Sequence, residues 1–356
     1  MKDGVSVRER VRVRDRMKEI VMDGERVSER KRECESVKRE SRRDFGNLGF
    51  DRMKKKLILL LMRLLSALPL CVHHFNAHIV AWVARVVLHY RKKVVVDNID
   101  QAFPDLDEKA RRKIVKDFYL HLGQIICETI WFGGSSKKRL RKSHIMEILN
   151  PEETERLHQL GKTVILLTSH SGNWELFGGL PLCNYSDKDM PITWDNSFVV
   201  YLRLKDKMWD EIFKQNRSYC IGNFDNMIET SKIMRHILQH LDDKNFYLMI
   251  TDQWPYAKSS AHIEVEFMGR RTLSMNGGAA IAHKYGCPVS FLSFNRREGG
   301  KKYSLELKTI CDDASQMSVQ EIMDRYYVLL EEDIRRDPAN YLWSHRRSKK
   351  YDRQKI

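Results

Sequence analysis

The sequence lacks the cysteine patterns that mark metal centres and redox motifs. Its seven cysteines are scattered along 356 residues, none of them stands in a C-x-x-C pair, and no spacing between them suits a zinc site. We therefore expect reduced, structural thiols, and neither a metal nor a redox cofactor is implied.

Aromatic residues are almost missing from the first 52 positions, where only Phe45 and Phe50 occur among 16 Lys/Arg and 12 Asp/Glu. Such a segment has little apolar surface to bury, so it is expected to be a disordered or isolated charged extension. Met53 then opens a basic and apolar stretch that looks like a natural amino terminus, and a mis-set start codon would explain residues 1–52. A nucleic-acid-binding arm is the alternative, although the interspersed acids nearly cancel its charge.

The apolar run 57–72 is slightly short for a membrane span of about 20 residues, and Arg63 and Pro69 interrupt it. A shallow or monotopic anchor therefore competes with a true span. A cleaved signal peptide is disfavoured because no small-residue cleavage site follows promptly.

A second apolar helix is predicted over 75–90. Basic residues bracket the pair of helices at 54–56 and 91–93, as expected beside the anionic cytoplasmic leaflet of a membrane. Residues 53–93 are therefore expected to anchor the chain at the inner membrane with the active site on the cytoplasmic face. Two core helices of a soluble domain are the alternative.

The rest of the composition indicates a folded, basic protein. Hydrophobic residues make up 42% of the chain, which is enough for a large core. The formal net charge of +15 predicts attraction to phosphate-bearing surfaces, whether nucleic acid, anionic lipid or an acidic carrier protein.

The most informative segment follows a continuous apolar run at 163–168, which predicts a buried strand. His170 stands at the end of this strand and Glu175 five positions later. A carboxylate that accepts a hydrogen bond from one imidazole nitrogen leaves the other nitrogen free to take a proton from a hydroxyl group. By itself this pair is weak evidence, because a structural histidine would produce the same pattern.

A second predicted strand at 246–251 is followed by Asp252 and Gln253. Open α/β sheets place ligand-binding groups at the carboxyl ends of their strands, so both side chains are candidates for substrate binding. A loop or helix-cap role for Asp252 is the alternative.

The segment 169–175 resembles the H-x4-D/E block of the glycerolipid acyltransferases, in the form found in bacterial lipid A biosynthesis acyltransferases. Further segments resemble the blocks of that family and appear in its order: Asn98–Pro104, Phe118–His121 with Glu128, Val199–Arg217, Thr251–Pro255, Phe267–Gly269 with Thr272, and Tyr341–Arg347. The resemblance extends over roughly residues 94–350 and implies an α/β acyltransferase domain with a mixed sheet flanked by helices, followed by a short tail at 351–356.

Two positions depart from the family pattern. The family reads Tyr-Arg/Lys-Pro where this chain has Tyr201-Leu202-Arg203, so a cation that steadies the acceptor's phosphate would have to be Arg203 or Lys205. Ser348 replaces a tryptophan near the end of the last block, which puts the role of that cluster in doubt.

The resemblance also implies roles for individual residues. His170 would be the general base and Glu175 would orient it, while backbone N–H groups near Gly172 and Asn173 would be candidates to stabilise the oxyanion. The expected substrate-binding residues are Ser171, Gly172, Asn173, Arg203, Asp252 and Gln253.

The implied reaction moves a fatty acyl chain from an acyl thioester, with acyl carrier protein as the donor, to a hydroxyl of a lipid A precursor or related glycolipid. Transfer to another glycolipid or an aminolipid is the alternative. A thioesterase-like hydrolase, an inactive structural relative and a basic nucleic-acid-binding protein are further alternatives. No nucleic-acid partner is expected.

Overall fold

The structure is a computed structural model that describes residues 52–218, 225–255, 262–297 and 299–346. The chain separates into two units, Met1–Leu59 and Leu60–Ile356, and the fold described below is that of the second. The predictions made for the charged extension 1–52, apart from Arg52, and for Ser348 and the tail 351–356 lie outside the described residues.

Within the described residues, the main sheet has seven strands in the order β1-β9-β8-β2-β5-β3-β4, and a separate hairpin is formed by β6 and β7. The strands are β1 Met146–Ile148, β2 Val164–Thr168, β3 Ser197–Tyr201, β4 Met227–Glu229, β5 Phe246–Ile250, β6 His262–Phe267, β7 Arg270–Met275, β8 Val289–Arg296 and β9 Tyr303–Cys311. Strands β8, β2, β5, β3 and β4 run parallel to one another, and β9 is antiparallel to β8. The predicted mixed sheet is therefore confirmed.

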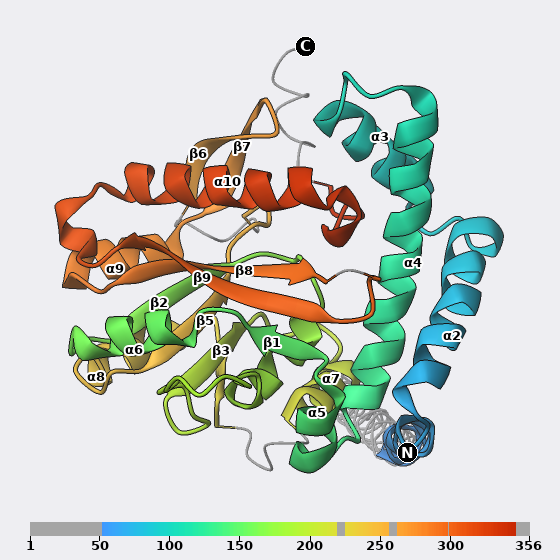
Figure 1. The fold of residues 1–356 in the computed structure, drawn as a ribbon, viewed down its shortest axis with the longest axis horizontal. Helices are drawn as coiled ribbons and strands as arrows, with labels where there is room; N and C mark the ends of the chain where they lie inside the picture. Colours follow the sequence, from blue (N-terminus) through green and yellow to red (C-terminus); the bar gives the residue numbers. More distant parts are fainter. Residues whose placement is uncertain (1–51, 219–224, 256–261, 298, 347–356) are drawn as a thin grey trace, which may run out of the picture. The chain divides into compact units, whose positions relative to one another are not determined.

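Helices cover both faces of the sheet (Figure 1). The helical elements are α2 Leu70–Trp82, η1 Val83–Val87, α3 Lys92–Ala102, α4 Glu108–Phe132, α5 Lys137–Ser143, α6 Pro151–Gln159, η2 Trp174–Leu182, α7 Lys207–Ser218, α8 Ile233–Gln239, α9 Gly277–Tyr285, η3 Ala314–Gln316, α10 Val319–Arg336 and η4 Pro338–Asn340. One core lies between the sheet and α8, α9 and α10, and the other between the sheet and α5, α6 and η2.

Local sequence explains where several of these elements begin. Asp107 caps α4 by accepting a hydrogen bond from the backbone N–H of Ala110, and Ser318 and Glu321 form a capping box at the start of α10. Strand β2 is buried along its whole length, because it lies in the interior of a parallel sheet that is covered on both faces.

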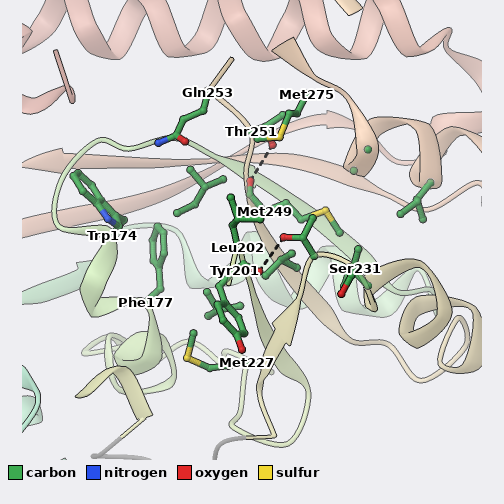
Figure 2. A pocket seen from close by; sticks show the side chains of 18 of the residues that line it. Trp174, Phe177, Tyr201, Leu202, Met227, Ser231, Met249, Thr251, Gln253 and Met275 are labelled. Carbon is green, nitrogen blue, oxygen red and sulfur yellow. Dashed lines mark hydrogen bonds between the residues drawn. The ribbon is translucent and has the colours of Figure 1, made fainter. Parts of the chain in front are cut away.

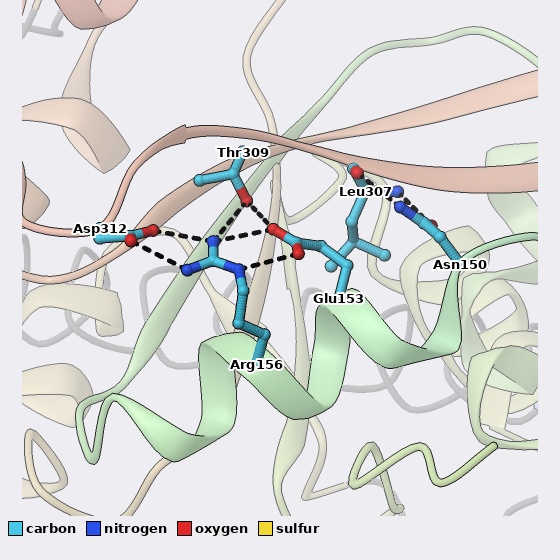
Figure 3. Close-up of polar contacts among 6 residues, drawn as sticks. All are labelled: Asn150, Glu153, Arg156, Leu307, Thr309 and Asp312. Atoms are coloured by element: carbon cyan, nitrogen blue, oxygen red, sulfur yellow. Dashed lines mark hydrogen bonds and ion pairs between the residues drawn. The ribbon is translucent and has the colours of Figure 1, made fainter.

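Polar contacts fix α6 against the antiparallel strand β9 (Figure 3). Arg156 on α6 binds Glu153 on its own helix and Asp312 just after β9, with N···O distances of 2.8–2.9 Å. The side chain of Asn150 donates to the carbonyl of Leu307 at 2.8 Å and accepts from its N–H at 3.0 Å. These contacts hold the sheet edge on the side away from the strand ends that carry the candidate site.

The amino-terminal helices differ from the expected pair of anchors. Helix α2 begins at Leu70, directly after Pro69, and continues into a π-helical turn over Val83–Val87. Among the described residues, no single helix is long and apolar enough to cross a bilayer. Helices Arg52–Ser66 and Leu70–Val87 meet the length and composition criteria only as a pair, and they are bent by 117° from each other.

Candidate functional site

The turn that carries His170 follows β2 at the carboxyl edge of the parallel strands. Gly172 in this turn has φ +61°, and a Cβ added to it would lie 2.7 Å from the ring of Phe294. The position therefore requires glycine both for its left-handed backbone conformation and for its close approach to the ring beneath it.

His170 contacts the carboxylate of Asp252. The distance from Nδ1 to Oδ1 is 2.6 Å, and the side chains are 15% and 2% exposed. Strand register explains the contact: Thr168 of β2 pairs with Ile250 of β5, so the residues two positions further along each strand come side by side. A buried carboxylate at Nδ1 favours the tautomer in which Nδ1 carries the proton, which leaves the lone pair on Nε2.

Two further side chains enclose the imidazole. The amide nitrogen Nε2 of Gln253 lies 3.0 Å from Nε2 and 3.4 Å from Nδ1 of His170, so it stands beside the ring and not in line with the Nε2 lone pair. The rings of His170 and Trp174 meet edge to face, with their centroids 5.0 Å apart. Gln253 and Trp174 therefore flank the imidazole ring.

The structure pairs Glu175, expected to orient His170, with Arg217. Both oxygens of Glu175 accept hydrogen bonds from Arg217 at the end of α7, at 2.6 and 2.7 Å. Burial acts to lower the pKa of Arg217, but the carboxylate of Glu175 overrides it, so that this pKa lies above its ordinary value. Glu175 is on η2, where the chain has already turned away from β2, and the neighbouring strand β5 supplies the carboxylate instead.

The turn is held by hydrogen bonds of its own residues Ser171, Gly172 and Asn173. Ser171 accepts a hydrogen bond from Ser169 at 2.8 Å, and the N–H of Gly172 donates to the backbone and side-chain oxygens of Asn340 at 3.2 and 3.0 Å. The side chain of Asn173 donates to Glu128 at 2.9 Å. Since the Gly172 N–H already has these acceptors, the structure does not place it as the expected oxyanion donor.

Arg203 lies apart from this cluster. Its side chain is 54% exposed and pairs with Asp210 at 3.5 Å, and it is not among the residues that line the cavity at His170. Arg217 and Lys284 do line the cavity, and the sequence interpretation singled out neither of them.

A cavity of about 790 Å³ extends from His170 along the ends of β3 and β5 (Figure 2). Most of its lining is apolar or aromatic, and its volume is within the range of small-molecule sites. Trp174 and Phe177 lie on one side of it, and Met249, Met275 and Ser231 on the other.

A histidine and a carboxylate at strand ends, opening into an apolar cavity, agree with what the sequence motifs imply. A family model for the bacterial lipid A biosynthesis acyltransferases matches residues 51–350. The chain belongs to this family. It is therefore an acyltransferase, and the resemblance deduced from the motifs is confirmed. A comparison with curated proteins gives no match.

In this acyltransferase, a buried network behind the turn includes residues of the family's amino-terminal blocks. Glu128 is fully buried and accepts hydrogen bonds from Asn173 and from the hydroxyl of Tyr303, at 2.9 and 2.8 Å, while Nε2 of His74 lies 3.0 Å from its other oxygen. His121 lies 3.1 Å from the carbonyl of Gly172, and burial lowers the pKa of His121 to about 3. A neutral His121 therefore donates to that carbonyl from Nε2.

The sequence interpretation missed the contribution of the chain's carboxyl-terminal part to the site. The N–H of Leu342 donates to the carbonyl of His170 at 3.1 Å, Tyr341 forms a β-bridge with Ser171, and Asn340 binds Gly172. The only signal available was the resemblance of Tyr341–Arg347 to the last family block, which gives no indication of what it contacts.

Proposed function

We propose that this acyltransferase moves a fatty acyl chain from an acyl thioester to a hydroxyl group of a lipid A precursor, with His170 as the general base. The observation that supports this best is the contact of His170 Nδ1 with Asp252 at the mouth of a largely apolar cavity of about 790 Å³. The arrangement supplies a base with a fixed tautomer beside a space suited to hydrocarbon.

In the proposed reaction, the acceptor hydroxyl approaches Nε2 of His170 beside the Gln253 amide and gives its proton to that nitrogen. The oxygen forms a bond to the thioester carbonyl carbon, and the resulting oxyanion accepts a hydrogen bond from the Gln253 amide. When the oxyanion collapses, the C–S bond breaks and the imidazolium returns the proton to the leaving thiolate. Asp252 stabilises the imidazolium throughout and keeps its own charge.

We further propose acyl carrier protein as the donor, and α5 as the surface that receives it. Helix α5 carries the exposed residues Lys137, Lys138, Arg141 and Lys142. Nζ of Lys137 lies 3.8 Å from the ring centroid of Trp194, which lines the cavity. A basic helix beside the cavity attracts an acidic carrier.

Charge reversal at Lys138 and Lys142 tests this surface. It should raise KM for the carrier thioester several-fold at low salt and leave KM for a short thioester unchanged. Equal effects on both donors would reject α5 as the docking surface.

We propose that α2 places the protein on the cytoplasmic surface of the inner membrane. Its outer face carries Phe75, Ile79 and Trp82, which are 67%, 52% and 56% exposed, and the exposed His78 lies among them. The opposite face packs through Ala77 and Ala81 on α4, where a Cβ added to Gly123 would overlap the carbonyl oxygen of Ala77. Small residues toward the neighbouring helix and large apolar ones outward are typical of helices that face lipid.

The proposed function is tested by following a labelled acyl chain from acyl carrier protein into a total lipid extract in detergent. We expect the label in a phosphorylated glycolipid, and a loss of at least ~100-fold in His170→Ala. Label in an aminolipid or another glycolipid would change the acceptor but keep the class. Release of free fatty acid at the same rate without lipid would indicate a hydrolase, and undiminished transfer by His170→Ala would refute the base.

A further inference from the structure

The cavity at His170 extends on both faces of the sheet. Val199 and Val200 are consecutive on β3, Met249 and Ile250 are consecutive on β5, and all four line the cavity. Consecutive side chains on a strand point to opposite faces. Val200 and Met249 belong to the core on the α9 side of the sheet, whereas Val199 and Ile250 pack with the core on the η2 side.

The two parts of the cavity, which meet at the strand ends beside His170, differ in polarity. The α9 lobe is formed by Val200, Met249, Gly277, Ala280, Ile281 and Tyr285. The η2 lobe is formed by Trp174, Glu175, Phe177, Val199, Tyr201 and Arg217. The η2 lobe therefore contains an ion pair, whereas among the described residues the only cation against the α9 lobe is Lys284, whose exposed side chain lies at the end of α9.

From these observations, and on the basis of the acyl transfer proposed above, we infer that the α9 lobe binds the acyl chain of the donor and sets its length, while the η2 lobe binds the polar acceptor. A hydrocarbon chain laid against the Glu175–Arg217 pair would remove water from two charges and offer them nothing in return. A hydroxylated, phosphorylated acceptor can instead bind to those charges and to the hydroxyl of Tyr201.

The α9 lobe is shaped to measure a chain. Residues of α9 line it at intervals of three and four positions, from Gly277 to Ala280 or Ile281 and then to Lys284 or Tyr285. One stripe of α9 therefore faces the cavity. The helix begins at the catalytic edge, where Ser274 donates to the carbonyl of Thr251 at 3.1 Å, and ends beside the start of β8. From Gly277 to Tyr285 the helix rises about 12 Å, and this is the distance over which the lobe can distinguish acyl chains of different length.

Two matched variants test this assignment. Val200→Phe and Val199→Phe add the same ring at neighbouring positions on opposite faces. In a series of acyl carrier thioesters of increasing length, we expect Val200→Phe to lower kcat/KM for the longest chains used by the wild type by ~10-fold or more and to spare the shortest. Val199→Phe should leave the dependence on chain length unchanged and raise KM for the acceptor lipid.

A third variant separates an effect on the α9 lobe from a general loss of folding. A Cβ built on Gly277 meets no atom within 4 Å, so Gly277→Leu projects into open space at the start of the α9 lobe. It should reduce the use of all but the shortest chains and leave the unfolding temperature close to that of the wild type. A shift of the chain-length profile in Val199→Phe, or an equal loss for every chain in both Val200→Phe and Gly277→Leu, would overturn the assignment.

A binding measurement separates this inference from the proposed function. A fluorescent fatty acid bound to the full chain is displaced by saturated fatty acids of increasing length, which requires no transfer. Weaker displacement by long chains in Val200→Phe, together with no transfer by the wild type, would keep the α9 lobe and reject the proposed reaction. Displacement that ignores both Val200→Phe and Gly277→Leu while the wild type transfers acyl chains would reject the lobe alone.

Discussion

Replacing Asp252 by asparagine should reduce kcat strongly while leaving the fold intact. The side chain keeps its size at a position that is 2% exposed, but the 2.6 Å contact with Nδ1 of His170 loses its charge. An amide that donates to Nδ1 selects the tautomer in which Nε2 carries the proton, and it does not stabilise the imidazolium. The loss of a charge-assisted hydrogen bond and of the correct tautomer is worth about 3 to 5 kcal/mol, or a factor of ~10² to 10⁴ in kcat.

Glu175→Gln is the control, because it also removes one carboxylate charge, from a side chain that lines the cavity beside His170. Its amide oxygen can still accept from Arg217, so we expect a modest rise in KM for the acceptor and little change in kcat. Steady-state kinetics on both variants, with circular dichroism to verify folding, decides between the two carboxylates. If Glu175→Gln lost ~100-fold in kcat and Asp252→Asn kept full activity, Glu175 would regain the orienting role.

Three further predictions concern the support of the site. Gly172→Ala should lower the free energy of unfolding, measured in urea, by well over 1 kcal/mol. Gly269→Ala, also at positive φ but with nothing within 4 Å of its Cβ, should lower it by only about 1 kcal/mol. Equal losses would refute the argument that the ring of Phe294 excludes a Cβ at Gly172. His121, with its pKa lowered to about 3, stays neutral in the folded state, while the unfolded chain takes up a proton at this residue below about pH 6.5, so the protein loses stability as the pH is lowered through this window. Between pH 7 and 5 the free energy of unfolding of the wild type, measured by urea titration, should decrease by about 2 kcal/mol more than that of His121→Gln. Equal decreases would contradict the buried neutral histidine. Serine in place of Phe75, Ile79 and Trp82 on the outer face of α2 should reduce flotation with anionic vesicles severalfold. Unchanged flotation would show that another surface binds the membrane.

The sequence predicted the elements of this fold better than their contacts. The apolar runs at 163–168 and 246–251 located β2 and β5. These features depend on local periodicity and end signals, which a single sequence contains. The order of the strands depends on packing between distant segments, and no pattern in this sequence reveals that β5 lies between β2 and β3.

That strand order explains which of the candidate side chains the structure brings together. His170 and Asp252 were both selected because they follow strands, but 82 positions separate them in the sequence, and only the pairing of β2 with β5 brings them together. Glu175 was selected because it is close in sequence, and proximity along the chain is a poor guide once the chain turns into η2. Arg217 carried no local signal beyond the family block in which it stands.

The described residues around His170 also explain why such distant parts of the chain belong to one site. The turn after β2 is held by α4 through Glu128 and His121, by Tyr303 of β9 through Glu128, and by the segment 340–342 through the two backbone hydrogen bonds of its β-bridge. In the proposed reaction, a base that takes a proton from a hydroxyl and returns it to a thiolate needs a fixed position relative to both substrates. If the two lobes bring those substrates from opposite faces of the sheet, as inferred above, a shift of this turn toward either face improves the approach to one substrate at the expense of the other. Rigid support from several elements is therefore what the proposed two-sided site requires, and loosening Glu128 should impair the use of donor and acceptor together.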